Sequence, residues 1–479
     1  MRHILTSLIL TIFASTGVKA ELTVDTKKIA EKIDHQVRVS GVSKSDLGIW
    51  LGPSAIGANN IYELNSEKLF IPASLTKILT AYASFKTFPM SHKFKTQLLT
   101  QGKFADDKLN GNLILKGFGD PSFTSESMWV LVNHFVRTGV KEITGDIVVD
   151  DTYFDSVRFD NTREPSRVDR AYDAPIGAMS FNWNSVNVYV RPGLKVGAPA
   201  RIYADPMSSY IKVINRATTA KGKVKNIRVS RIKDDSRPGD TIIVAGTIGI
   251  EKEEVVSYKS ITEPSFWSGI HLKEFLDQRG ITLKGKIVKG KATPEATVLA
   301  ELEGSDLRKV VTDMMKFSNN YVAEMLTKNI STFSGNKPGN IADGIEQIRK
   351  ILETNLGFKK EYYSLLNPSG LTRKNRIRPV DLSHLLNKAK SNFKFFPEFI
   401  ASMPISGIDG TLKEKFSEEV DIRVRAKTGL LNGVSGLAGY IGHPNGETLT
   451  FTFIYNGNQG NIDKAVVLFE NILKTVISN

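Results

Sequence analysis

Ser74 and Lys77 have the spacing of a nucleophile and its base. They lie in the stretch IPASLTKILT, residues 71–80, where an apolar run predicts a helix through about Phe85. Three residues are nearly one helical turn, so both side chains face the same side. A buried lysine is costly unless it is paired or neutralised. We therefore interpret Ser74 as a nucleophile that Lys77 activates; a lysine that merely reaches the surface is the alternative.

Two further stretches supply the side chains that serine–lysine acyl transfer requires. One holds Ser318 and Asn320 within KFSNNYVAEML, and the other is Lys427-Thr428-Gly429, the one K-T-G of the chain. Ser-x-x-Lys and Ser-x-Asn recur elsewhere in the sequence, so each is weak support alone. Their order, and the type of element predicted under each, favour the joint interpretation.

Other chemistries find little support in the composition. Cysteine is absent, which excludes a thiol nucleophile and a thiolate metal site. The seven histidines stand in no nucleophile-elbow or metal-ligand spacing, so no metal or cofactor is expected. The formal net charge of +14 attracts polyanions. No aromatic–basic motif points to nucleic acid, which leaves envelope anions and a merely solvated basic surface open.

Residues 1–20 predict a secretory signal peptide rather than part of the fold. A short basic start precedes an apolar core from Ile4 to Ala14, and small residues end at Ala20, where we expect cleavage. The apolar core is too short for a comfortable membrane span.

The elements around the motifs change character along the chain. A hairpin at 47–51 and 61–64 precedes Ser74, and a β-rich region runs from about 96 to 300. Helical spacing of apolar residues then returns, and the chain ends in an amphipathic helix that we expect to pack on a sheet. The later predictions are helices at 304–330, 378–392 and 462–477, and strands at 437–441 and 448–455.

These motifs and their surroundings resemble the low-molecular-mass class C penicillin-binding proteins, the D-alanyl-D-alanine carboxypeptidase/endopeptidases. The resemblance covers nearly the whole mature chain. It includes KGFGDPSF, GDIVVDDTYFD, MSFNWNSVNV, NPSGLTRKNRI, GIDGTLKEKF and KTGLLNGVSGLAGYIG. The long separation between Ser74 and Ser318 is similar to that of the same class.

The resemblance implies a multidomain α+β fold with a penicillin-recognising, β-lactamase-like domain. Residues 21–95 and 305–479 would form this domain, with a five-stranded antiparallel sheet flanked by helices. Residues 96–304 would be a β-rich insert that supplies a second domain. A third domain would be nested in it near 122–208.

The resemblance also implies roles in acylation. Ser74 would be acylated, Lys77 would be its general base, and Ser318 would relay protons. The backbone amides of Ser74 and Leu430 would form the oxyanion hole. We expect burial and the nearby Lys427 cation to lower the pKa of Lys77, which must be neutral to act as a base.

Substrate binding would fall to five residues. Asn320 would hold the substrate amide, while Lys427 and Thr428 would bind the terminal carboxylate, with Gly429 and Leu430 beside them. Lys427 would stay charged by binding that carboxylate. Leu430 stands where the family usually has Thr or Ser, so a hydroxyl for the carboxylate is lost and another leaving group, such as a cross-linked diaminopimelate centre, is favoured.

The expected function is that of a periplasmic DD-peptidase. Its substrates would be peptidoglycan stem peptides, and β-lactams would inhibit it covalently. The segment Asp151 to Asp155 resembles one that recognises the distal amine of the stem peptide, and Asn367-Pro368 stands where Asp-Gly is common. A serine β-lactamase or esterase on the same fold, and an inactive wall-binding module, are the alternatives.

Overall fold

A five-stranded antiparallel sheet joins the two ends of the chain. The computed structural model describes residues 26–57, 59–162, 169–420 and 422–479, so the predicted signal peptide lies outside the described residues. The sheet has the order β2-β1-β22-β21-β20, and the predicted hairpin at its edge is confirmed. Its strands are β1 (Leu47–Pro53), β2 (Tyr62–Leu64), β20 (Val424–Leu431), β21 (Val434–Gly442) and β22 (Thr448–Asn456).

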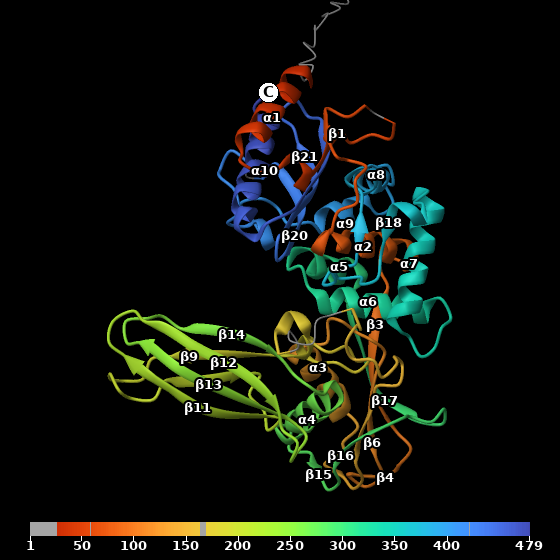
Figure 1. Ribbon diagram of the computed structural model, residues 1–479. Coiled ribbons are helices and arrows are strands. Elements are labelled where there is room, and N and C mark those ends of the chain that lie inside the picture. The colour runs from red at the N-terminus through yellow and green to blue at the C-terminus, as the bar shows by residue number, and fades with distance from the viewer. Residues whose placement is uncertain (1–25, 58, 163–168, 421) are drawn as a thin grey trace, which may run out of the picture.

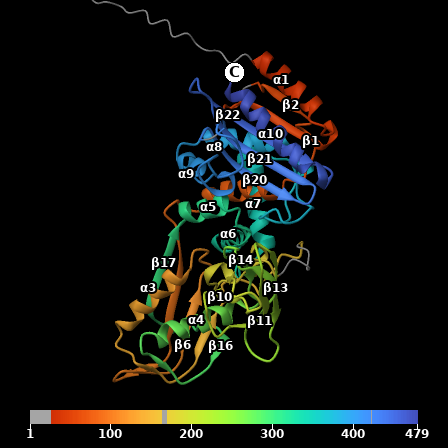
Figure 2. The same cartoon turned by 90° about the vertical axis from the view of Figure 1, so that its left-hand side faces the viewer.

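Helices cover both faces of this sheet (Figures 1 and 2). Successive residues of a strand point to opposite faces. Leu437 and Ile441 of β21 accordingly pack with α1 (Thr26–Val39) and α10 (Ile462–Ile477), while Ala438 and Tyr440 pack into the other helical layer. The predicted packing of the last helix on a sheet is therefore confirmed. Within the described ranges, no helix combines the length and apolar composition that a bilayer span needs.

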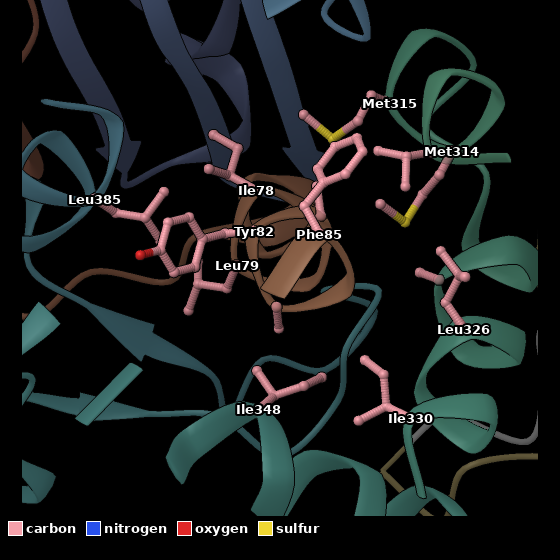
Figure 3. Packing of buried hydrophobic residues seen from close by; sticks show 14 of the residues in the cluster. Ile78, Leu79, Tyr82, Phe85, Met314, Met315, Leu326, Ile330, Ile348 and Leu385 are labelled. Atoms are coloured by element: carbon pink, nitrogen blue, oxygen red, sulfur yellow. The ribbon is translucent and has the colours of Figure 1, made fainter. Parts of the chain in front are cut away.

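The helix that follows Ser74 lies at the centre of the second layer. This is α2 (Thr76–Thr87), and every residue from Thr76 to Phe85 is buried. A helix that is buried all round is surrounded by other elements. Figure 3 shows apolar side chains of neighbouring helices converging on it, among them Met314, Leu326, Ile348 and Leu385. The helices of this layer are α5 (Leu307–Lys316), α6 (Asn320–Phe333), α7 (Ile341–Leu356), α8 (Pro379–Lys390) and α9 (Phe396–Ala401), with a short β18 (Tyr363–Ser364) and β19 (Arg376–Ile377) beside them.

The insert begins and ends on neighbouring strands of a second five-stranded sheet. Its order is β16-β8-β6-β3-β17, and β3 and β17 pair antiparallel where the chain leaves and re-enters the helical layer. The elements of this body are β3 (Lys93–Thr100), β4 (Lys103–Ala105), β5 (Lys108–Asn110), β6 (Leu113–Gly117), α3 (Ser125–Val136), β7 (Glu142–Ile143), β8 (Ile147–Asp150), α4 (Pro264–Asp277), β15 (Thr282–Leu283), β16 (Ile287–Gly290) and β17 (Thr297–Asp306).

Two three-stranded sheets project from the insert (Figure 1). Their orders are β10-β9-β14 and β11-β13-β12. The strands span 185–260, whereas the nested domain is predicted near 122–208. We propose 185–260 as the nested unit, inside an insert of 96–304 and a catalytic domain of 21–95 and 305–479. The strands are β9 (Ser185–Arg191), β10 (Arg201–Asp205), β11 (Ile211–Ala220), β12 (Lys225–Lys233), β13 (Asp240–Gly249) and β14 (Val255–Ser260).

Candidate active site

Ser74 sits in a tight turn before α2 rather than inside the helix. The turn spans Ala73–Leu75, and Ala73 has a φ of 48°, a left-handed conformation that costs an alanine about 1–3 kcal/mol. The Thr76 hydroxyl donates to the Ala73 carbonyl at 2.8 Å. On the other side, a Cβ added to Gly370 would lie 1.9 Å from that carbonyl, so only glycine fits there. The Thr76 hydrogen bond and the close approach of Gly370 thus fix the turn, and Ser74 lines a cleft.

Lys77 is fully buried and meets three segments of the chain. Its Nζ donates to Ser74 Oγ at 3.1 Å, to Asn320 Oδ1 at 2.6 Å and to the Ser369 carbonyl at 2.5 Å. The predicted juxtaposition of Ser74 and Lys77 is therefore present. A neutral amine at this position is within reach of the Ser74 hydroxyl proton.

A break between two helices presents Ser318 and Asn320. The sequence predicts a helix over 304–330, but α5 ends at Lys316 and α6 begins at Asn320. Ser318 has a φ of 54°, which an α-helix cannot continue through, and the Asn319 side chain caps α6 by accepting from the Val322 amide at 3.2 Å. The prediction of one continuous helix is wrong at this point because a cap replaces helical hydrogen bonds.

Asn320 links the catalytic body to the insert. Its Oδ1 accepts from Lys77, and its Nδ2 donates to the Tyr172 carbonyl at 2.9 Å. Tyr172 belongs to the turn Ala171–Asp173 of the insert, and its side chain lines the same cleft as Ser74. Tyr172 belongs to none of the motifs, because a contribution through a backbone carbonyl leaves no signal in the sequence.

Lys427 stands on β20, opposite Ser74. Its buried Nζ donates to Ser318 Oγ at 2.8 Å and to the Thr428 carbonyl at 2.7 Å. Burial, and secondarily the Lys415 cation, lower the pKa of Lys427 to about 7. Without a bound carboxylate, Lys427 therefore loses its proton near neutral pH.

The residues after Lys427 form the edge of the cleft. Thr428 Oγ1 lies 2.8 Å from Thr411 Oγ1, so its hydroxyl is already oriented. A Cβ on Gly429 would approach the Pro72 carbonyl to 2.8 Å, which shows how closely β20 passes the Ser74 turn. Leu430 is 64% exposed and lines the cleft.

The cleft is large and basic. It measures about 1200 Å³, and Ser74, Ser318, Asn320, Thr428 and Leu430 line it. Arg170, Arg373 and Lys415 also line it, while none of the described lining residues is acidic. A cleft of this character attracts ligands that carry carboxylates.

The loop that touches Lys77 is built around one buried asparagine. Asn367 Oδ1 accepts from the backbone amides of the next residues, including Gly370 at 2.8 Å. Its Nδ2 donates to Asp160 Oδ2 at 3.0 Å and to Glu324 Oε1 at 3.4 Å. Two carboxylates therefore face the Asn367 amide, and the amide holds the Ser369 carbonyl against Lys77.

The carboxylates of Asp151 and Asp155 bind neighbouring groups within the protein. Asp151 pairs with Arg158 and accepts from the Met179 amide at 2.6 Å. Asp155 accepts from the buried Lys328 Nζ at 2.5 Å. The structure does not bring either carboxylate to the cleft that holds Ser74.

Ser74 beside the buried Lys77, Ser318 and Asn320 at a helix break, and the K-T-G strand thus lie around one cleft. This is the arrangement that the resemblance to penicillin-recognising serine enzymes leads us to expect. The model of the D-Ala-D-Ala carboxypeptidase 3 (S13) family matches residues 29–471. A D-alanyl-D-alanine carboxypeptidase of Actinomadura sp. (strain R39) is 30% identical over 469 residues, which cover 95% of this chain and 84% of that one.

Solved structures share the fold. Penicillin-binding protein 4 (dacB) of Haemophilus influenzae superposes with a TM-score of 0.77 at 21% identity, covering 95% of this chain and 99% of that one. A penicillin G-acylated predatory endopeptidase from Bdellovibrio bacteriovorus, in complex with an immunity protein, has a TM-score of 0.51 at 14% identity and covers 90% of each chain.

The chain belongs to the D-Ala-D-Ala carboxypeptidase 3 (S13) family. It is a low-molecular-mass class C penicillin-binding protein and a serine-type D-Ala-D-Ala peptidase. The resemblance drawn from the motifs and the predicted fold class are confirmed.

Asn367→Asp tests whether the amide supports the site. We expect the change to destabilise the fold by about 3 kcal/mol, because it removes two donated hydrogen bonds and brings a third carboxylate to Asp160 and Glu324. The rate of acylation by a fluorescent penicillin should fall with it. Thermal unfolding and labelling rates are the measurements, and Asn355→Asp on the exposed face of α7 is the control. Equal stability of the two variants would contradict this role of the amide.

Lys415→Gln tests the electrostatic control of Lys427. In the wild type we expect kcat/KM for a peptide ending in D-Ala-D-Ala to fall above about pH 7, because Lys427 loses the charge that its K-T-G motif is expected to offer to the carboxylate. Removing the Lys415 cation raises the pKa of Lys427, so the decline should move to higher pH. Lys413→Gln, two residues away, is the matched control. If kcat/KM of Lys415→Gln declined at the same pH as in the wild type, the effect of the Lys415 cation on the pKa of Lys427 would be contradicted.

Proposed function

We propose that the cleft cleaves D-Ala peptide bonds of peptidoglycan through an ester on Ser74. The observation that carries the proposal is the 3.1 Å contact between the Nζ of the fully buried Lys77 and the Oγ of Ser74, which lines the cleft. Neutral Lys77 takes the hydroxyl proton while Ser74 Oγ attacks the carbonyl carbon of the penultimate D-alanine. The backbone amides of Ser74 and Leu430 stabilise the oxyanion.

Release of the leaving group requires that a proton reach the departing nitrogen. The amide C–N bond breaks, and the departing amine receives, through the Ser318 hydroxyl, the proton that Lys77 took from Ser74, so that Lys77 is neutral again. Ser318 Oγ is held by Lys427 Nζ at 2.8 Å, and Lys427 keeps its own proton. Water then attacks the ester carbonyl carbon while Lys77 accepts a proton from it. The acyl carbon–Oγ bond breaks, and Lys77 returns that proton to Ser74 Oγ, which regenerates the serine. Asn320 holds the substrate amide, and Lys427, Thr428 and Gly429 bind the terminal carboxylate.

The basic lining supports a peptide substrate with several carboxylates, as peptidoglycan stem peptides have. Arg170, Arg373 and Lys415 surround the position of Ser74 without a described acidic neighbour in the lining. The predicted signal peptide supports a periplasmic location, where this substrate lies. Recognition of a distal amine by Asp151 or Asp155 lacks support, since both acids pair with internal cations.

β-Lactams are expected to acylate Ser74, as penicillin G acylates the structural neighbour from Bdellovibrio. The sequence alone leaves a β-lactamase or esterase and an inactive wall-binding module as alternatives. The convergence of Ser74, Lys77 and Asn320 in one hydrogen-bonded group argues against an inactive module. The insert, which reaches Asn320 through Tyr172, favours a polymeric substrate over a small lactam.

Substitutions on α2 and its leading turn test the roles of the nucleophile and the base. Ser74→Ala should abolish labelling by a fluorescent penicillin, and Lys77→Ala should slow it by about 10²–10⁴-fold at neutral pH. Ser84→Ala and Lys86→Ala change the same residue types later in the helix and should label normally. Near-normal labelling of folded Lys77→Ala would refute its role as general base, and a labelled Ser74→Ala would refute the nucleophile.

Leu430→Thr tests the preference between free ends and cross-links. A restored hydroxyl can add one hydrogen bond to the substrate carboxylate, worth about 1.5–3 kcal/mol, or a tenfold to hundredfold rate gain if it is realised in the transition state. We expect the ratio of rates to shift toward a muropeptide ending in D-Ala-D-Ala and away from a D-Ala–diaminopimelate cross-linked dimer. Leu431→Thr is the control. An unchanged ratio would mean that Leu430 contributes only its backbone amide.

A further inference from the structure

The two sheets of the nested unit have one end attached to the rest of the insert and one free end. The chain enters on β9 and leaves on β14, where Ser185 and Ser260 pair beside the rest of the insert. Strands β11 and β13 have ten residues each, so the opposite end lies about 30 Å away. Figure 1 shows these sheets projecting away from the other elements of the molecule.

Three turns meet at the free end and are bonded to one another. The Gly193 amide donates to Thr219 Oγ1 at 2.7 Å, and the Gly197 amide donates to the Thr219 carbonyl at 2.8 Å. The Ile250 amide donates to the Ala220 carbonyl at 2.8 Å. We call this group, residues 192–198, 221–225 and 250–253, the distal tip. It is one connected surface rather than three independent loops.

The distal tip exposes aliphatic side chains. Leu194 is 88% exposed and Val196 is 53% exposed on the first turn. Val224 and Ile250, on the other two turns, are 44% and 38% exposed. Single exposed apolar residues are ordinary, but four of them on one connected tip indicate a surface that contacts something apolar.

Positive charge surrounds these side chains. The tip carries five lysines and two glutamates, Glu251 and Glu253. Four of the lysines are exposed: Lys195, Lys221, Lys223 and Lys225. A partner that suits the tip must therefore be anionic at its surface and apolar beneath it.

We propose that the distal tip docks on a lipid bilayer that carries anionic headgroups. Leu194 and Val196 would enter the boundary between headgroups and acyl chains, while the lysines would remain among the headgroups. A hydrophilic polyanion would satisfy the lysines but would leave Leu194 in water. Docking through the tip leaves the cleft around Ser74 open, because that cleft is lined from the catalytic body and the turn at Tyr172.

Flotation with vesicles tests this proposal on the mature full-length chain. Binding to vesicles of phosphatidylcholine with 30% phosphatidylglycerol should exceed binding to phosphatidylcholine alone and should weaken with salt. Lys221→Gln/Lys223→Gln/Lys225→Gln should reduce the affinity roughly a hundredfold, at about fivefold per lysine. Leu194→Ser/Val196→Ser should also weaken binding, and Leu194→Trp should show a blue-shifted emission that brominated lipids quench.

The control removes the same charge elsewhere. Lys350→Gln/Lys359→Gln/Lys360→Gln on the catalytic body should bind vesicles like the wild type, and all variants should label normally with penicillin. An equal loss in this control would mean that net charge, and not the tip, drives binding, which overturns the proposal. Absence of wild-type vesicle binding, or retention by isolated peptidoglycan sacculi in place of vesicles, would overturn it as well.

Discussion

The active site depends on keeping the Lys77 amine out of water while giving it polar partners. A buried amine without partners would cost several kcal/mol, so its hydrogen bonds to Ser74, Asn320 and the Ser369 carbonyl are a condition of the fold. These partners come from segments almost 300 residues apart in sequence. The site therefore forms only when α2, α6 and the 367–371 loop are packed in this arrangement, and losing any one of these contacts would leave the buried amine short of a partner.

The insert takes part in that arrangement. It reaches the Asn320 side chain through the Tyr172 carbonyl, which fixes the amide orientation so that Oδ1 faces Lys77. A cleft formed by the helical layer and β20 alone would lack this anchor. The insert thus affects the geometry around Lys77 and, through Arg170 and Tyr172, the lining of the cleft.

Sequence patterns predicted the elements whose signals are local or periodic. The hairpin before Ser74, the buried α2 and the terminal helix follow from alternation and helical spacing, and Ser74, Ser318 and Lys427 meet in one region as their motifs predicted. The break at Ser318 was missed because Ser and Asn fit both a helix and its cap. Tyr172 and Asn367 were missed as site-forming residues because their contributions depend on contacts between distant segments, which leave no pattern in the chain.

The basic cleft involves a compromise between attracting the substrate and keeping Lys427 charged. Cations around Ser74 draw in carboxylates, but each cation near Lys427 also lowers its pKa, and burial already brings that pKa to about 7. A substrate carboxylate reverses the balance because it favours the charged amine. If Lys427 binds the substrate carboxylate as proposed, it is most strongly charged when that ligand is in place, and the cleft gains selectivity for peptides that end in a free carboxylate. Arg170 and Arg373, which line the cleft but are not among the causes of the lowered pKa, attract such peptides without that cost.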